Sequence, residues 1–279
     1  MQGETVVITG ATSGLGEAAA LEFARRGARI VLVARDGVRA DATMAKLKAA
    51  GPRVEHKAHL AAFSSIKDMK RVGAEIAAQE PRINVLANNA GALLAKRITT
   101  DEGLESTFAV NHMAYFVLTA ALLETLRATP GARIINTASS AHSFVRKLDF
   151  DDLNSERMGV MYAYGLSKLC NILFTRELAK RLEGSGVTAN CFHPGFVASR
   201  FGSGNGLLSP LIDFGKNFGA ISSEKGADTL IWLATSEQGG KDSGGYYIRR
   251  KRAIPSAEAQ SDSNAKKLWE ISEQLMAQA

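Results

Sequence analysis

Short runs of β-branched and apolar residues alternate along the chain with longer stretches in which apolar positions recur at helical spacing. The short runs predict strands at residues 5–9, 29–34, 53–56, 83–87, 132–137, 187–192 and, as a last edge strand, 246–248. The longer stretches predict helices at residues 14–26, 39–50, 64–79, 104–126, 158–182, 222–235 and 264–276. This alternation is typical of a parallel sheet that helices cover on both faces.

Length and composition agree with one folded domain. The 279 residues are 46% hydrophobic and 22% charged, which excludes disordered, collagen-like and disulfide-scaffold proteins. No low-complexity segment or linker divides the chain. We therefore predict an α/β fold, a single doubly wound Rossmann-type domain over residues 1–279 with a central parallel sheet of about seven strands. In such sheets the ligand lies at the carboxyl ends of the strands, where the strand order reverses.

The net charge of +6 leaves the identity of an anionic partner open. The basic run at residues 249–252 could indicate nucleic acid. A single run of this length is more simply explained as a solvated face or a salt-bridge site, and no aromatic residues are interleaved with it. We therefore expect no nucleic-acid partner.

The cysteines and the apolar runs bear on location. Cys170 and Cys191 are widely spaced and form no CxxC pair, which indicates a reducing compartment. The longest apolar run, residues 115–123, is far shorter than a membrane span, and the N-terminus lacks a signal-peptide pattern. The histidines show no metal-ligand spacing. We expect a cytoplasmic protein with no membrane span and no metal site.

A glycine-rich loop follows the first predicted strand and opens the first predicted helix. Gly10 permits a tight turn, Gly14 leaves room for a pyrophosphate, and Gly16 lets the helix pack closely on the strand. The free N–H groups and the positive end of the helix then face the anion. Glycine-rich turns are common, but this placement favours a dinucleotide site. Its expected loop residues are Gly10, Thr12, Ser13, Gly14, Leu15 and Gly16.

The end of the second strand indicates which dinucleotide fits. A carboxylate there would bind the ribose 2′-hydroxyl of NAD(H), whereas an arginine accommodates the 2′-phosphate of NADP(H). The strand ends at Arg35, whose guanidinium suits a phosphate, and Asp36 is equally well explained as the N-cap of the next helix. We favour NADP(H), with NAD(H) as the alternative; Arg35 could also be a solvated loop charge.

Further motifs follow the later strands in a fixed order. These are Asn88-Asn89-Ala90-Gly91, then Ser139-Ser140, then Tyr164-Gly-Leu-Ser-Lys168, then Pro194-Gly-Phe-Val-Ala-Ser199. Together with the glycine loop they resemble the short-chain dehydrogenase/reductase family over essentially the whole chain. The segments at residues 136–142, 148–153, 167–174 and 268–272 are most similar to its retinol-dehydrogenase-like members.

The pair Tyr164 and Lys168 indicates acid–base chemistry. The two residues are four apart on a predicted helix, so they share one face. A nearby ammonium group stabilises a phenolate, which lets the tyrosine exchange a proton near neutral pH. The resemblance implies that Tyr164 protonates a carbonyl oxygen in reduction, or takes the alcohol proton in oxidation. It also implies that Lys168 holds the nicotinamide ribose.

The resemblance assigns two further catalytic residues. Ser140 would hydrogen-bond to the substrate oxygen, with Ser139 as the alternative. Asn111 would kink its helix and support a water relay to the lysine, although it could instead be a buried structural amide. The cofactor itself supplies the hydride.

The remaining cofactor contacts also come from the resemblance. They are Asn88, Ala90, Gly91, Pro194, Gly195, Val197 and Ser199, together with Tyr164 and Lys168. The chain departs from the family at His59-Leu60, where an aspartate usually precedes the leucine and receives the adenine amino group. A neutral imidazole at His59 could accept that hydrogen bond or stack on the adenine.

Residues 199–221 combine several glycines with apolar side chains, and in this family the position forms a substrate lid. Such a lid would close over a hydrophobic ligand and exclude water, so we expect a lipophilic or aromatic carbonyl or alcohol substrate. The family also pairs the helices at 104–126 and 158–182 across a two-fold axis. We expect a homodimer or homotetramer, although these helices could simply be buried.

The expected function is thus an NADP(H)-dependent oxidoreductase that interconverts a carbonyl and an alcohol. A non-catalytic dinucleotide-binding regulator or scaffold on the same fold is the alternative. Such proteins typically lose the tyrosine or the lysine, and both are present here. A related lyase or epimerase that uses its cofactor transiently would show no net consumption of NADPH.

Overall fold

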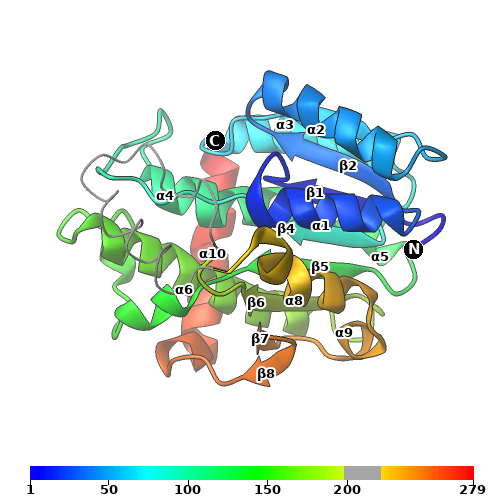
Figure 1. The fold of residues 1–279 in the computed structure, drawn as a ribbon. Coiled ribbons are helices and arrows are strands. Elements are labelled where there is room, and N and C mark those ends of the chain that lie inside the picture. Colours follow the sequence, from blue (N-terminus) through cyan, green and yellow to red (C-terminus); the bar gives the residue numbers. More distant parts are fainter. Residues whose placement is uncertain (198–220) are drawn as a thin grey trace.

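The computed structural model describes residues 1–197 and 221–279, which form one mostly parallel sheet with helices on both faces (Figure 1). Within these residues the sheet has eight strands in the order β3-β2-β1-β4-β5-β6-β7-β8, and only β8 runs antiparallel. The strands are β1 (Thr5–Thr9), β2 (Arg29–Ala34), β3 (Lys57–Leu60), β4 (Val85–Asn88), β5 (Arg133–Thr137), β6 (Thr188–His193), β7 (Tyr246–Ile248) and β8 (Lys251–Ala253). The predicted doubly wound fold is confirmed.

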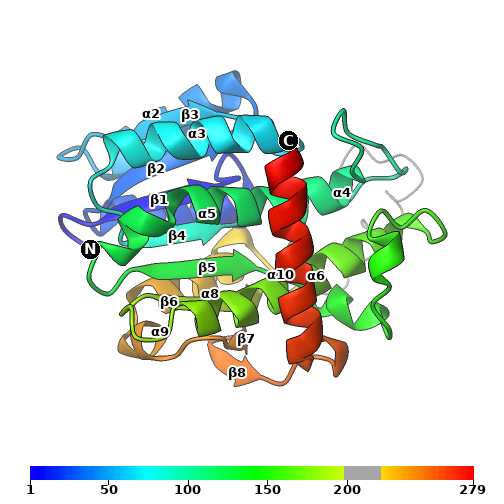
Figure 2. The ribbon, with the colours of Figure 1, turned by 180° about the vertical axis from the view of Figure 1, so that it is seen from behind.

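The helices form two layers, one on each face of the sheet. The larger ones are α1 (Gly14–Arg25), α2 (Gly37–Ala50), α3 (Ile66–Gln79), α5 (Ala114–Arg127), α6 (Val160–Arg181), α8 (Ser223–Thr235) and α10 (Asp262–Gln278). Helices α1, α2 and α8 cover one face, while α3, α5, α6 and α10 cover the other (Figures 1 and 2). Short elements are α4 (Ser106–Phe108), α9 (Glu237–Lys241) and the 3₁₀ turns Ser140–Phe144, Phe150–Asp152 and Glu258–Gln260.

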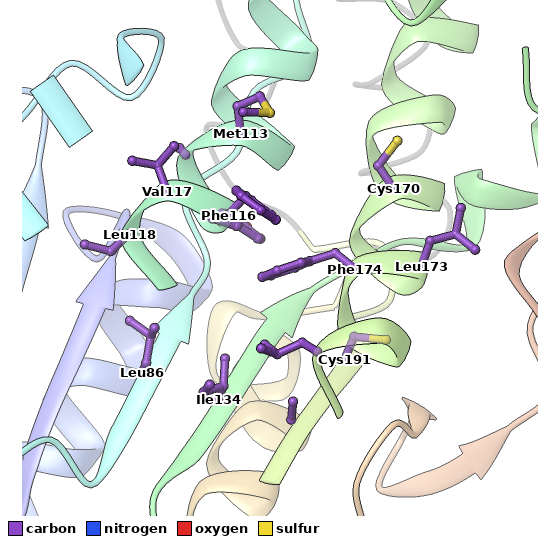
Figure 3. Packing of buried hydrophobic residues seen from close by; sticks show 14 of the residues in the cluster. Leu86, Met113, Phe116, Val117, Leu118, Ile134, Cys170, Leu173, Phe174 and Cys191 are labelled. Atoms are coloured by element: carbon purple, nitrogen blue, oxygen red, sulfur yellow. The ribbon is translucent and has the colours of Figure 1, made fainter. Parts of the chain in front are cut away.

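The strands are buried on both faces because their alternate side chains enter two different cores. Val31 and Val33 of β2 join the core beneath α3, α5 and α6, and Ile30 and Leu32 join the core beneath α1, α2 and α8. This two-sided burial explains why the strands are continuous apolar runs. In the first core, Phe116 of α5 packs on Phe174 of α6 with ring centroids 5.6 Å apart (Figure 3).

The third strand is four residues later than predicted. Residues 51–54 form a turn, closed by the Val54 N–H that donates to the Gly51 carbonyl. His56 then accepts a hydrogen bond from the Ile30 N–H through Nδ1 at 3.1 Å, before the strand begins. The pairing of Val31 with Lys57 through Ala34 with Leu60 defines the strand, and that tertiary register leaves no local signal in the sequence.

The predicted edge strand at residues 246–248 is not the edge. Arg249 and Arg250 both have positive φ, 50° and 63°, and form a two-residue hairpin turn that returns the chain as β8. Arg250 pairs with Asp228 of α8. Two residues of the basic run, Arg249 and Arg250, therefore form a tight turn, and Arg250 also forms an ion pair.

The predicted helix at 104–126 is a helical stretch with a π-helical turn, Ala109–Met113, between α4 and α5. By length and composition, Ser106–Arg127 is the one described helical stretch that could cross a membrane, and 78% of its most apolar window is buried in the protein. Its packing on α3 and within the core explains its apolar character. A membrane span is therefore not supported.

Candidate active site

The glycine loop lies at the carboxyl end of β1, where the strand order reverses between β2 and β4. Gly10 and Gly14 have φ of 69° and 60°, a region that disfavours other residues. A Cβ on Gly10 would lie 2.6 Å from Cα of Ala90, and one on Gly16 would lie 2.6 Å from the Gly10 carbonyl oxygen. Only glycine fits at these positions without a clash or backbone strain. The loop therefore forms a narrow cradle at the end of β1.

The cradle ends at the N-terminus of α1. Within the described residues, Ser13 occupies the N-cap but its side chain makes no capping hydrogen bond. The N–H groups of the first turn are therefore available for an anion. Thr12 is half-buried in the loop, and Leu15 packs on the core beside α8. These features fit the pyrophosphate of a dinucleotide.

Thr9 and Asn89 hold the cradle against the next strand, and neither was assigned from the sequence. The Thr9 hydroxyl accepts hydrogen bonds from the N–H groups of Asn89 and Ala90, each at 2.9 Å. Asn89 returns a bond from Nδ2 to the Thr9 carbonyl at 3.1 Å. The adjacent Asn88 is fully buried, and its side chain bonds to Thr119 and Asn136. In the described residues the Asn88 side chain therefore ties α5 to the sheet.

Tyr164 and Lys168 lie together on α6, as their spacing predicts. Lys168 is buried, and its Nζ lies 5.7 Å from the Tyr164 ring centroid and donates to the Thr137 carbonyl at 3.1 Å. Burial lowers the pKa of Lys168 to about 7. Burial also raises the pKa of Tyr164 to about 12, against the opposing effect of a hydrogen bond from Ser139. Burial, and not the ammonium effect expected from the sequence, therefore gives the direction of the shift, which favours the neutral phenol.

The Ser139 hydroxyl lies close enough to the Tyr164 phenol to lower its pKa, against the larger effect of burial. Ser139 is the N-cap of the 3₁₀ turn Ser140–Phe144, and its Oγ accepts from the Ala141 N–H at 3.2 Å. Ser140 is exposed, and its carbonyl accepts a hydrogen bond from Ser143 Oγ. The N-cap position places Ser139 beside α6. We therefore favour Ser139, the alternative from the sequence, over Ser140 as the catalytic serine.

Asn111 lies in the π-helical turn and joins three segments. Its Oδ1 accepts from the Ala92 N–H at 2.7 Å, and its Nδ2 donates to the Ala92 carbonyl and to Ser167 Oγ, each at 2.9 Å. A Cβ on Gly91 would lie 3.3 Å from Asn111 Oδ1 and 3.5 Å from Lys168 Nζ. The structure thus brings Asn111, Gly91 and Lys168 together.

Tyr115 is a further buried residue of this site that the sequence did not single out. Its hydroxyl donates to the Ala90 carbonyl at 2.8 Å, and its ring centroid lies 6.0 Å from Lys168 Nζ. The residue lies inside the apolar run at 115–123, where nothing distinguishes it from a core aromatic. Only the fold shows that it connects the segment after β4, at Ala90, to the lysine.

The far end of the expected cofactor site contains Arg35 and His59. Arg35 is exposed after β2, and Asp36 caps α2 by accepting from the Arg39 N–H at 3.1 Å. His59 is buried on β3, with Nδ1 3.3 Å from a Glu75 carboxylate oxygen. Leu60 is 49% exposed. The imidazole is therefore already held by Glu75 on one side.

The segment after β6 is described only in part. Gly195 has φ 87°, and Val197 bridges to Ile221, whose N–H donates to the Phe196 carbonyl. Pro194, Gly195 and Val197 thus follow the end of β6, next to the start of α8. Ser199 and the expected lid at 199–221, apart from Ile221, lie outside the described residues. Over the described ranges, no group of three or more His, Cys, Asp or Glu could hold a metal ion.

Comparison with known proteins agrees with this geometry. The family model described as short chain dehydrogenase matches residues 4–205. Human "Retinol dehydrogenase 13" is 37% identical, over 98% of this chain and 85% of the relative. "Putative daunorubicin C-13 ketoreductase DnrU" of Streptomyces sp. (strain C5) is 41% identical, over 98% of this chain and 92% of the relative.

Solved structures share the fold along nearly the whole chain. An uncharacterized protein of Mycobacterium paratuberculosis is 29% identical with a TM-score of 0.78, covering 99% of this chain and 94% of its own. The Pseudomonas aeruginosa RhlG/NADP active-site complex is 25% identical with a TM-score of 0.72, covering 93% of this chain and 97% of its own. The chain therefore belongs to the short-chain dehydrogenase/reductase family, on its retinol-dehydrogenase-like branch, and is an oxidoreductase of carbonyls and alcohols.

Proposed function

We propose that the protein is an NADP(H)-dependent reductase or dehydrogenase in which Tyr164 exchanges the proton. The observation that carries the proposal is the meeting of Tyr164, Ser139, Lys168 and Asn111 at the carboxyl ends of the strands, beside Gly91. The glycine cradle lies at the same edge, so a cofactor and a substrate would meet there.

The residues of the cradle fit a dinucleotide, which would supply the hydride when bound. The N–H groups at Ser13, Gly14 and Leu15 would hold the pyrophosphate, and Lys168 would hold the nicotinamide ribose. The exposed guanidinium of Arg35 supports a 2′-phosphate and hence NADP(H) over NAD(H). A related solved structure contains NADP, which is in line with this choice.

The proton chemistry follows from the burial of the tyrosine. A neutral phenol is the form that can protonate the developing alkoxide during carbonyl reduction. Ser139 Oγ, beside the phenol, would hydrogen-bond to the same substrate oxygen and stabilise its negative charge. The Thr137 carbonyl accepts from Lys168 Nζ, which lies 5.7 Å from the Tyr164 ring centroid, so the lysine would favour the phenolate that remains after proton transfer.

The preference for a lipophilic or aromatic substrate remains a proposal. Its support is the half-exposed Phe196 after β6 and the names of two relatives, which refer to retinol and to the C-13 ketone of daunorubicin. The expected cytoplasmic location is likewise a proposal, and the free, buried thiols of Cys170 and Cys191 are compatible with it.

The homodimer or homotetramer is likewise a proposal. Every residue of α6 from Gly165 to Thr175 is buried within a single chain, and α10 packs on this helix (Figure 2). We keep the dimer or tetramer as a prediction, but its contact would have to use a surface other than the part of α6 beneath α10.

A panel of ketones, aldehydes and alcohols, each with NADPH, NADP, NADH and NAD, tests the proposed function. The absorbance of the reduced nicotinamide reports net turnover. We expect reduction of apolar or aromatic carbonyls with NADPH. Turnover without net consumption of the cofactor would indicate a lyase or epimerase instead, and faster turnover of small polar ketones would contradict the substrate class.

A further inference from the structure

A series of buried polar side chains connects helix α10 with the active-site lysine. Ser272 of α10 is fully buried, and its Oγ lies 3.0 Å from Nε2 of His112. The side chain of Asn171 lies close enough to the His112 ring to raise its pKa, against the larger effect of burial. Asn171 Nδ2 donates to the Thr137 carbonyl at 3.1 Å, and the same carbonyl accepts from Lys168 Nζ at 3.1 Å. The two ends of the series are thus linked through one carbonyl group.

The expected position of the imidazole proton follows from two buried atoms that lack a partner. Nδ1 of His112 and Oδ1 of Asn171 are both buried, and neither has a hydrogen-bond partner among the described residues. Buried polar atoms are costly unless they are paired. Both are satisfied if His112 carries its proton on Nδ1 and donates to Asn171 Oδ1. Nε2 then accepts from the Ser272 hydroxyl, which can rotate away from the Leu268 carbonyl that it otherwise meets at 2.8 Å.

The imidazole is held in a neutral, rigid surrounding. His112 is fully buried, and burial lowers its pKa to about 3. Its ring packs 5.2 Å from Phe108 and 6.0 Å from Phe174, measured between centroids. His112 also follows Asn111 directly in the π-helical turn, so an anchor on its side chain restrains the backbone that presents Asn111.

Helix α10 is itself clamped onto α6, which makes it a firm anchor. Asp262 bridges Arg176 and Lys180 of α6, each at 2.8 Å. Trp269 packs on Phe116 with ring centroids 5.0 Å apart, and the guanidinium of Arg181 lies 4.3 Å from its ring centroid. Figure 2 shows α10 lying across the helices of this face. These contacts place Ser272 in a defined position relative to α6.

We propose that His112 is a positioning residue through which α10 fixes Asn171 and, through the Thr137 carbonyl, the ammonium group of Lys168. The inference rests on the proposed function of Lys168 and Tyr164. Helix α10 has no residue that would touch the substrate or the cofactor in this proposal. It would nevertheless affect the rate of the chemical step.

Histidine ring nitrogens labelled with ¹⁵N test the hydrogen-bond pattern without any turnover. We expect His112 to be neutral with its proton on Nδ1. Its nitrogen shifts should change in both Ser272→Ala and Asn171→Ala. They should not change in Ser263→Ala, which removes an exposed serine hydroxyl from the same helix. A proton on Nε2, or unchanged shifts in Ser272→Ala, would overturn the proposal.

Kinetics test the positioning role. We expect Ser272→Ala to lower kcat about three- to tenfold while KM for the ketone and the dissociation constant of NADPH stay within about twofold. Ser263→Ala should match the unaltered protein. In an Asn171→Ala background the Ser272→Ala change should have little further effect, because the connection is already broken.

The outcomes separate the two proposals. A loss of kcat that persists undiminished in the Asn171→Ala background, or a proportional loss of NADPH binding, would mean that Ser272 only stabilises the fold, and the positioning role would be wrong. If the unaltered protein turns over no carbonyl or alcohol, the proposed function fails on its own. The nitrogen shifts of His112 then still decide whether the hydrogen-bond series exists.

Discussion

Ser139 lies beside the phenol of Tyr164 and lowers its pKa, while the side chain of the neighbouring Ser140 is exposed. We therefore expect Ser139→Ala to lower kcat about a hundredfold, because a hydrogen bond to the developing oxyanion is lost. Ser140→Ala, the same chemical change one residue away, should alter kcat less than about twofold. Steady-state kinetics with NADPH and a reactive ketone measure both. The reverse ranking would restore Ser140 as the catalytic serine.

Tyr164→Phe removes one hydroxyl from a half-buried ring and keeps its shape. We expect kcat to fall by about a thousandfold or more, because the proton donor is gone. The dissociation constant of NADPH, measured by fluorescence, should stay within about threefold because the cradle is untouched. Tyr162→Phe, on the same helix, is the matched control and should retain activity. Unchanged turnover in Tyr164→Phe would favour another mechanism or the non-catalytic alternative.

The sequence predicts a strand best where a continuous run of apolar, β-branched residues is bounded by polar ones. Arg29–Ala34 is such a run, and its predicted bounds are those of the structure. It fails at β3, because four residues with two polar side chains become a strand only by pairing with β2. The turn at Arg249 and Arg250 is missed for a similar reason. Positive φ at two arginines is imposed by the pairing of β7 with β8 and not by local preference.

The site shows the same division. Motif spacing on one helix brings Tyr164 and Lys168 to one face, since helical geometry alone determines it. Whether Ser139 or Ser140 turns toward them depends on a 3₁₀ cap, and two adjacent serines do not differ in sequence preference for it. The links from Thr9 to Ala90, and from Ser272 to His112, join residues 81 and 160 positions apart. Contacts at such separation need the fold.

Arg35→Ala tests the assigned cofactor. We expect KM for NADPH to rise about tenfold or more because the 2′-phosphate loses a charged partner. KM for NADH, which lacks that phosphate, should change less than about twofold. Arg53→Ala removes an equal charge from the exposed turn before β3 and serves as the control. An equal loss with both cofactors, or faster turnover with NADH in the unaltered protein, would contradict the role of Arg35.

The buried Lys168 predicts a rise of stability with pH. Its folded-state pKa is lowered to about 7, whereas an unfolded lysine titrates near about 10.4. Between these values the unfolded state binds the additional proton, so the free energy of unfolding increases with pH. From about pH 7 to about pH 8.5 this group should contribute a gain of roughly 1.5 kcal/mol.

Urea unfolding across that window, with and without Lys168→Met, measures the effect. Buried histidines do not interfere, because burial lowers the pKa of His112 to about 3 and of His193 to about 4, and an unfolded histidine titrates near about 6.5. Cys170 and Cys191 oppose the trend toward the upper end of this window, where unfolded thiols begin to lose protons, because burial raises their thiol pKa values. This opposing effect is common to all the variants. The gain should vanish in Lys168→Met and persist in Lys266→Met, where an exposed lysine is removed. An undiminished rise in Lys168→Met would mean that Lys168 stays protonated when folded.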